Sequence, residues 1–360
     1  MHSVYIHIPF CNNICSYCDF SKVYYNEELV DKYLEALKKE VNKDYKGEVI
    51  KTIYIGGGTP SSLSIKQLNT LFSIIKIFKL ANKIEFTIEC NPESMTKEKL
   101  SLFKHNKVNR LSIGVQTFNK SHLKLLNRVH TKKQVKELIK DAKEIGIANI
   151  NIDLIYGLSN QTIKEVEDDI DAILKLDVTH ISTYSLIIEE NTKLYINNVK
   201  NINEETEYEM YELIRKKLLE NGFIHYEISN FSKEGYQSKH NLNYWNNNNY
   251  YGFGLGAHGY INNIRYENTR SLTKYIDNKY LYECHKLTKQ EMMENEMILG
   301  LRKIKGVNKK EFKTKYKRNI KQVFNIDALI DSNDLIEDNE NIYIPINRIY
   351  ISNNILINFI

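Results

Sequence analysis

The stretch SVYIHIPFCNNICSYCDF, residues 3–20, joins a run of β-branched and aromatic residues to three closely spaced cysteines. Its first six residues predict a β-strand. Cys11, Cys15 and Cys18 follow at intervals of four and three, and Phe20 stands where a fourth cysteine would complete the set. The pattern predicts a strand whose carboxyl end carries a group of thiolate ligands.

Similar runs predict five further strands, at residues 51–57, 83–90, 110–116, 149–157 and 180–188. Helical patterns lie between them: one begins behind Asn26, and two open with the capping boxes of Thr131 and Thr162. Six strand and helix units in series predict a parallel sheet with right-handed crossovers. Such a sheet is either open and doubly wound or a partial barrel.

The regular alternation fades after about residue 223, which predicts three parts. Residues 1–222 form the α/β core. Residues 223–290 form a linking segment that includes a stretch rich in Tyr, Asn and Gly, and residues 291–360 form a small domain of helices and a short hairpin.

The composition excludes several classes of protein. Fifty Lys and Arg against 45 Asp and Glu give a net charge of +5, too mild and too interspersed to indicate a nucleic-acid or membrane partner. The sequence has no membrane-spanning apolar run and no secretory signal pattern, so we expect a soluble, cytoplasmic protein. In a reducing compartment, three clustered cysteines among five favour metal or redox chemistry over disulfides.

Polar residues and glycines stand at the carboxyl ends of four predicted strands: GGGTP at 56–60, Glu89, Gln116 and Asp153. Ligands of parallel α/β sheets bind at these ends, so the sequence predicts that they share one site. Taken singly, the glycine run is equally typical of a tight turn. Each carboxylate taken singly is explained better by a buried ion pair with Arg110 or Arg128.

Two kinds of metal site fit three cysteines. A structural zinc ion takes four ligands, and His2 or His7 would have to complete a Cys3His set. A [4Fe-4S] cluster held by three thiolates leaves one iron open to a small molecule. The cluster explains the missing fourth cysteine, since the open position is then the functional one.

The spacing CxxxCxxC, with Tyr17 before the last cysteine, resembles the hallmark of the radical S-adenosylmethionine (SAM) superfamily. Within it, the chain resembles the branch of the oxygen-independent coproporphyrinogen III oxidases (HemN) and the heme chaperones (HemW). The motifs that carry this resemblance are YIHIPFC, YIGGGTPS, ECNPE, RLSIGVQTF, LNRVH and NIDLIYGL. The resemblance implies a partial (β/α)6 TIM-like barrel with a small C-terminal domain, helical or winged-helix-like.

The resemblance also implies the cofactors and the residues that hold them. Cys11, Cys15 and Cys18 would bind a [4Fe-4S] cluster, and the open iron would bind SAM. By similarity, the residues expected around SAM are Tyr5, Tyr17, Gly57, Gly58, Thr59, Glu89, Gln116, Arg128, Asp153 and Ile187.

Three features favour the chaperones over the oxidases. Phe20 occupies the fourth position of the CxxxCxxCxC motif usual in the oxidases, and the chain begins ten residues before Cys11, without the long extension that the oxidases carry. HNLNYW, at 240–245, resembles the HNxxYW motif associated with heme binding in the chaperones.

This motif gives the expected heme site. His240 is the expected iron ligand, and Tyr244 and Trp245 would cover a porphyrin face. His258 is a second candidate ligand. Without the resemblance, a packed turn with a hydrogen-bonded histidine explains the same residues.

The expected function is that of a heme chaperone, which binds heme and passes it to an acceptor protein while it carries the cluster and SAM. The alternative is a radical SAM enzyme that decarboxylates coproporphyrinogen III. Expected partners are heme, the acceptor, a flavodoxin-type reductant if SAM is cleaved, and a second copy of the chain. Ten Lys and Arg within 302–321 raise nucleic-acid binding as a further class, but a solvated helix face explains them more simply.

Overall fold

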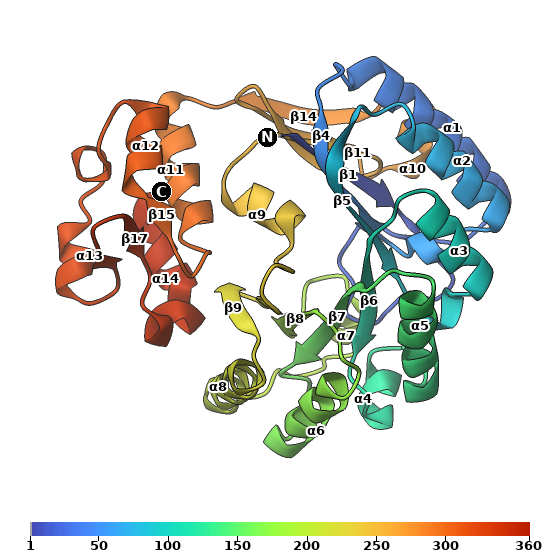
Figure 1. The fold of residues 1–360 in the computed structure, drawn as a ribbon, viewed down its shortest axis with the longest axis horizontal. Coiled ribbons are helices and arrows are strands. Elements are labelled where there is room, and N and C mark those ends of the chain that lie inside the picture. The colour runs from blue at the N-terminus through green and yellow to red at the C-terminus, as the bar shows by residue number, and fades with distance from the viewer. Residues whose placement is uncertain (1) are drawn as a thin grey trace.

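The computed structural model describes residues 2–360 and is built around one 12-stranded sheet (Figure 1). The strand order is β14-β13-β12-β11-β1-β4-β5-β6-β7-β8-β10-β9. The seven strands from β11 to β8 in this order run parallel, and the outer ones are antiparallel. Strands β14 and β9 form the two edges, so the barrel is partial, as predicted.

Six of the parallel strands are those predicted from the sequence: β1 His2–Ile8, β4 Ile50–Gly57, β5 Leu80–Cys90, β6 Arg110–Gln116, β7 Asn149–Tyr156 and β8 His180–Ser185. A short pair, β2 Phe10–Cys11 and β3 Val23–Tyr24, brackets the cysteine loop.

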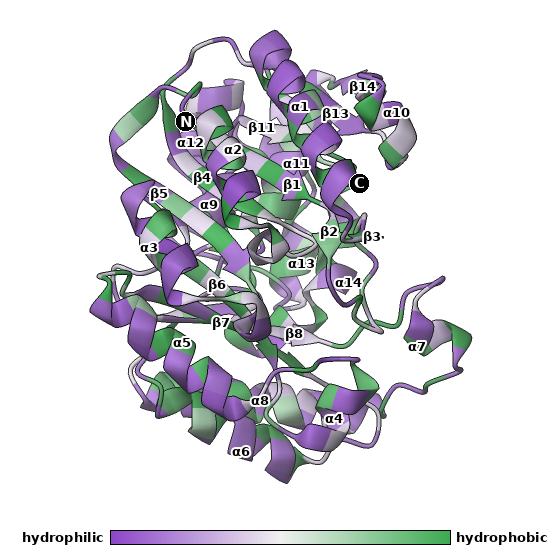
Figure 2. Ribbon diagram, turned by 90° about the vertical axis from the view of Figure 1, so that its right-hand side faces the viewer, coloured by the Kyte–Doolittle hydropathy of each residue, from purple (hydrophilic) through white to green (hydrophobic). Residues whose placement is uncertain are grey.

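Helices follow the strands: α1 Glu27–Asp44, α2 Ile65–Ile75, α3 Lys97–His105, α4 Lys120–Leu125, α5 Lys132–Glu144, α6 Ile163–Leu174, α7 Lys193–Ile196 and α8 Glu204–Glu220. Apart from the short α4 and α7, they cover the outer face of the sheet (Figure 1). The predicted caps at Asn26, Thr131 and Thr162 are confirmed. Hydrophilic and hydrophobic residues alternate along α5 and α6 in Figure 2, as in helices with one buried face.

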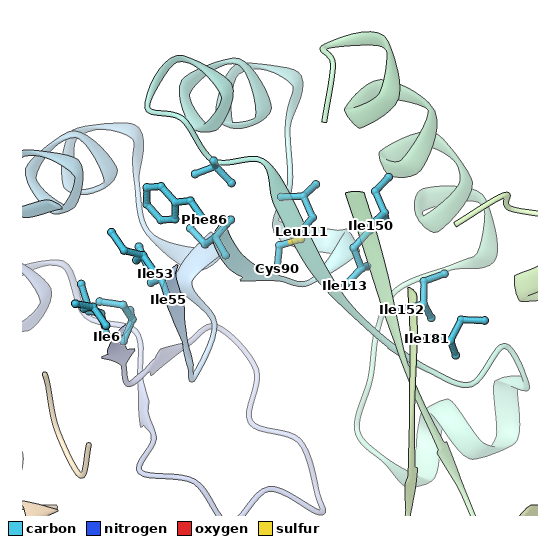
Figure 3. Close-up of a cluster of buried hydrophobic side chains, with 14 of the residues drawn as sticks. Ile6, Ile53, Ile55, Phe86, Cys90, Leu111, Ile113, Ile150, Ile152 and Ile181 are labelled. Carbon is cyan, nitrogen blue, oxygen red and sulfur yellow. The ribbon is translucent and has the colours of Figure 1, made fainter. Parts of the chain in front are cut away.

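The two faces of the parallel sheet differ in polarity because side chains alternate along each strand. Figure 3 shows Phe86, Leu111 and Ile150 between the strands and the outer helices, and all three are fully buried. Their neighbours in sequence face the interior of the partial barrel, where Glu89 and Asp153 lie. The apolar core therefore lies outside the sheet, and the polar groups line the interior.

The chain after residue 222 extends this sheet at both ends, with β9 Ile224–Glu227, β10 Asn230–Ser232, β11 Tyr250–Phe253, β12 His258–Ile261, β13 Ile264–Asn268 and β14 Leu281–Lys286. Helices α9 Lys239–Trp245 and α10 Leu272–Ile276 connect these strands. β11, which pairs in parallel with β1, lies in a segment for which no strand was predicted. The division at residues 222 and 290 stays a prediction.

The last part of the chain forms a separate group of elements, with α11 Lys289–Gly300, α12 Lys309–Tyr316, α13 Asp327–Asp331, α14 Ser352–Leu356, β15 Val307–Asn308, β16 Ile336–Glu337 and β17 Asn341–Tyr343. Short 3-10 helices lie at Pro60–Ser62, Pro92–Ser94, Ile320–Gln322, Ile346–Ile351 and Ile357–Phe359. The predicted hairpin is the antiparallel pair of β16 and β17. No helix within residues 2–360 has the length and apolarity needed to cross a membrane.

Candidate functional site

A cavity of about 450 Å³ opens at the carboxyl ends of the parallel strands, and we call it the first cavity. Its lining includes the cysteine loop and inward-facing residues of β4 to β8. The residues predicted from the sequence that line it are Cys11, Cys15, Tyr17, Cys18, Gly57, Gly58, Thr59, Glu89, Gln116, Arg128, Asp153 and Ile187. The topology thus brings five strand ends together, and contact of each residue with SAM stays a prediction.

The three cysteines of the loop are free thiols on the wall of this cavity. Thr59 donates a hydrogen bond to Cys11 Sγ at 3.5 Å, and Arg128 Nη1 donates one to Cys15 Sγ at 3.5 Å. Burial raises the pKa of Cys11 to about 11 and also raises the pKa of Cys18. The ionised forms of Cys11 and Cys18 therefore need a nearby positive charge to stabilise them, which a bound metal supplies.

The cysteine loop fits a cluster better than a single ion. Within residues 2–360, no three His, Cys, Asp or Glu side chains converge closely enough to hold one metal ion. Both ring nitrogens of His7, a candidate fourth zinc ligand, are hydrogen bonded, to the Tyr5 hydroxyl at 2.9 Å and the Ser21 carbonyl at 2.7 Å. Three separated thiols around one cavity are the arrangement that a polyatomic cluster needs.

The glycine segment passes too close to its neighbours to carry side chains. A Cβ on Gly56 would lie 2.7 Å from the Glu89 carboxyl group, and a Cβ on Gly58 would lie 2.6 Å from the carbonyl carbon of Pro9. Gly57 has φ of +111° and donates its N–H to Glu89 Oε2 at 3.0 Å. These contacts fix the glycines beside the cysteine loop and leave their backbone accessible from the first cavity.

Two half-buried carboxyl groups face the first cavity. Glu89 accepts hydrogen bonds from the Tyr54 hydroxyl at 2.8 Å and from Gly57, and Asp153 accepts one from Asn151 Nδ2 at 2.7 Å. Burial, followed by the charge of Asp153, raises the pKa of Glu89 to about 7. Burial also raises the pKa of Asp153.

The ion pairs considered as alternatives for these carboxyl groups do not form. Arg128 directs Nη2 to Asn91 Oδ1 at 2.9 Å and to the Gly114 carbonyl. Arg110 acts on Asp153 only as a nearby charge that lowers its pKa, less strongly than burial raises it. Among residues 2–360 no salt bridge neutralises Glu89, so the first cavity fits a cationic ligand.

Two further residues of the first cavity carry signs of a ligand site. Gln116 has φ of 67°, a conformation that costs a non-glycine residue free energy and that clusters at functional sites. Arg128 Nε is buried without a hydrogen-bond partner. Ile187, the predicted apolar neighbour of adenine, is 66% exposed at the rim.

A second cavity, of about 550 Å³, lies beside β1, β11 and β12. The residues that line it are Tyr5, His7, Asp19, Phe20, Ser21, Tyr244, Trp245, Asn247, Tyr250, Gly256, His258, Arg265, Arg270 and Leu299. Asp19 and Phe20 line both cavities, so the segment after the last cysteine separates them.

Two predicted residues lie elsewhere than expected. Tyr5 lines the second cavity, because its strand β1 pairs with β11. The ring centroid of Tyr5 lies 6.2 Å from that of Tyr54, which lines the first cavity. His240 lines neither cavity: it is 1% exposed, and its ring nitrogens are hydrogen bonded to Thr52 Oγ1 and to the Tyr244 hydroxyl, both at 2.8 Å.

Sequence reasoning missed several lining residues. Tyr54, Asn91 and Tyr184 line the first cavity. The alternation of β4 and the motif ECNPE were signals for the first two. Arg265 and Arg270 line the second cavity, and no pattern in the sequence links them to the cysteines.

Comparisons with known proteins agree with this geometry. A model of the radical SAM superfamily matches residues 5–173, and a model of the HemN C-terminal domain matches residues 287–345. The structure of the coproporphyrinogen III oxidase HemN from Escherichia coli superimposes with a TM-score of 0.88 over 99% of this chain and 89% of that chain, at 21% sequence identity. This likeness establishes the fold, including the C-terminal part.

Curated relatives share more sequence. The heme chaperone HemW of Bacillus subtilis is 46% identical over 90% of this chain and 89% of its own length. The heme chaperone HemW of Lactococcus lactis is 40% identical over 100% of this chain and 97% of its own length. The heme chaperone HemW of Escherichia coli is 35% identical over 78% of this chain and 76% of its own length. The chain therefore belongs to the radical SAM superfamily and, within it, to the HemW family.

Proposed function

We propose that this chain is a heme chaperone of the cytoplasm, which binds heme and transfers it to an acceptor protein while it carries a [4Fe-4S] cluster and SAM. The observation that carries the proposal is the second cavity, whose wall combines Tyr244 and Trp245 with two histidines and two arginines. Aromatic rings suit a porphyrin face, a histidine suits its iron, and arginines suit its carboxylates. The names of the HemW relatives support the same conclusion.

The first cavity would hold the cluster on Cys11, Cys15 and Cys18, and SAM beside it. A bound cluster of this kind supplies an open iron and one electron. The Glu89 and Asp153 carboxylates would attract the cationic groups of SAM.

The glycine backbone lets the amino acid part of SAM approach closely. Arg128, held between Asn91 and Cys15, would face its carboxylate.

By the resemblance of its motif, His240 is one candidate for the iron ligand. To bind iron, it would have to exchange its hydrogen bond with Thr52 or that with Tyr244 for a bond to the metal. If His240 does bind the iron, His240→Ala weakens the Soret band that heme gives with the parent protein. An unchanged Soret band would remove His240 from the site.

The function is tested by heme transfer under anaerobic conditions. The heme-loaded protein is mixed with the heme-free form of a b-type heme protein, and absorbance follows the movement of heme. Direct transfer makes the rate rise with acceptor concentration, whereas passive release makes it independent of the acceptor. A protein that takes up no heme, or only releases it passively, is not a chaperone.

The same preparation tests the enzymatic alternative. Reconstituted protein is incubated with SAM, coproporphyrinogen III and a flavodoxin-type reductant, and the products are separated by chromatography. A chaperone gives no protoporphyrinogen, whereas turnover would identify an oxidase. Sedimentation of heme-free and heme-loaded samples tests the proposed second copy of the chain.

A further inference from the structure

Three histidines lie in or next to the second cavity, and they differ in whether a ring nitrogen is free. Both nitrogens of His7 are hydrogen bonded, and burial lowers its pKa to about 4. Both nitrogens of His240 are also hydrogen bonded, and its side chain does not line the cavity. His258 lines the cavity with a side chain that is 56% exposed.

The surroundings of His258 leave it able to bind a metal. Its one ion-pair partner within residues 2–360 is Glu267, whose Oε1 lies 3.7 Å from His258 Nε2, too far for a good hydrogen bond. A carboxylate behind a histidine orients the ring and raises its basicity as a ligand. His258 lies at the start of β12, in register with Glu267 on β13, so the pair is fixed by the sheet.

Two arginines stand near this histidine on the same wall. Arg270 Nε donates to Glu267 Oε1 at 3.3 Å, which leaves the two terminal nitrogens of its guanidinium for other partners. Arg265 is half-buried, and its Nε is buried without a partner. Guanidinium groups bind carboxylates in a bidentate manner, so the wall offers two binding positions for acidic groups.

Aromatic residues complete the cavity. Tyr244 and Tyr250 pack edge to face, with ring centroids 4.6 Å apart, and Trp245 lies next to them in sequence. Phe20 is 68% exposed and reaches the cavity from the cysteine loop. A volume of about 550 Å³ is within the range of about 300–1,000 Å³ that small-molecule sites occupy.

We propose that heme binds in the second cavity with His258, not His240, as its iron ligand, and with Arg265 and Arg270 as partners of its propionates. This inference rests on the proposed function and adds the binding site. A lone pair of the His258 imidazole forms the bond to iron and displaces water, with no change of oxidation state. His240 acts as a positioning residue, because its hydrogen bond fixes the Tyr244 hydroxyl.

The site places heme next to the cysteine loop. Asp19 and Phe20 line both cavities, so a porphyrin edge in the second cavity contacts the segment that follows Cys18. Phe20 thereby gains a role that a fourth cysteine would not fill, as an apolar wall between the cluster and the heme.

The first test measures ferric heme affinity and the Soret spectrum of the full-length protein and three variants. His258→Ala is expected to weaken affinity by roughly tenfold or more and to shift the Soret maximum, because it removes a ligand. The matched control is His285→Ala: His285 is also 56% exposed and lies 2.8 Å from a glutamate, Glu291. His240→Gln, which keeps a side-chain hydrogen bond, is expected to retain the parent's Soret maximum.

The outcomes separate the ligand assignment from the function. If the parent binds heme and His258→Ala gives the same affinity and spectrum, the assignment is wrong and the chaperone function stands. If His240→Gln shifts the Soret maximum and His258→Ala does not, His240 is the ligand. A parent without a Soret band overturns both proposals.

The second test uses protoporphyrin IX, which has the propionates of heme but no iron. His258→Ala is expected to bind it as tightly as the parent does, whereas Arg265→Gln combined with Arg270→Gln weakens both protoporphyrin IX and heme severalfold. Arg318→Gln, an exposed arginine of the C-terminal part, is the control. Loss of protoporphyrin IX binding in His258→Ala would mean that this histidine shapes the cavity and does not bind iron.

Discussion

The first cavity is lined by residues from consecutive strand ends, whereas the second cavity collects its wall from β1, α9, β11, β12, β13 and α11. The first contains three thiols and, on its inner wall, the carboxyl groups of Glu89 and Asp153. The second contains aromatic rings, an exposed histidine and two arginines. This difference indicates that the two cavities suit different ligands. The first suits a cationic cofactor and a cluster, and the second suits an apolar ligand with acidic groups.

The largest expected effect would show whether the two cavities act independently. Cys15→Ala removes one of three thiolates, so we expect iron after anaerobic reconstitution to fall from about four atoms per chain to fewer than about one. Iron and sulfide analysis measures it, with the exposed Cys284→Ala as control. Heme binding should persist in Cys15→Ala, and its parallel loss would show that the cavities depend on each other.

The next prediction compares how much stability the protein loses when His240 or His258 is replaced. His240→Ala removes the partner of the Tyr244 hydroxyl and one of the two partners of the Thr52 hydroxyl, and we expect the free energy of unfolding to fall by about 2 kcal/mol. His258→Ala removes an exposed side chain and is expected to change it by less than about 0.5 kcal/mol. Urea denaturation measures both. Equal losses would contradict the roles assigned to them.

A third effect concerns the charge of the first cavity. The Glu89 carboxyl has a pKa of about 7, above its ordinary value, so it is mostly protonated at pH 6 and mostly ionised at pH 8. Because the ionised form attracts the cationic groups of SAM, SAM affinity should rise about tenfold between these pH values.

Anaerobic titration calorimetry at pH 6, 7 and 8 measures this dependence. Glu89→Gln should remove it, and Glu189→Gln, an exposed residue of the same cavity, should not. A parent whose SAM affinity does not change with pH would rule out the ionisation of Glu89 as the cause.

The smallest effect tests the link between the buried histidine and the second cavity. Tyr244→Phe removes the hydroxyl that His240 Nε2 contacts and should cost about 1 kcal/mol of stability. Combined with His240→Ala, the total loss should be smaller than the sum, since both changes remove the same hydrogen bond. Additive losses in urea denaturation would mean that the contact contributes nothing.

The sequence was sufficient for most of the first cavity. Strand runs alternate with capped helices, and right-handed crossovers place every carboxyl end on one side, so Glu89, Gln116 and Asp153 meet without any further information. The same reasoning does not explain the position of Tyr5, whose contact with SAM stays a prediction. Nothing in its neighbourhood indicates that β11 would lie beside β1 and turn this residue toward another cavity.

By itself, the sequence determined the presence of six parallel strands, the position of the three thiols and the family to which the chain belongs, because these depend on local spacing. The tertiary structure alone decided which histidine is exposed and which arginines stand beside it. Burial depends on what packs against a side chain: His240 is enclosed by Thr52 and Tyr244, while His258 lies at the open wall of a cavity built from distant segments.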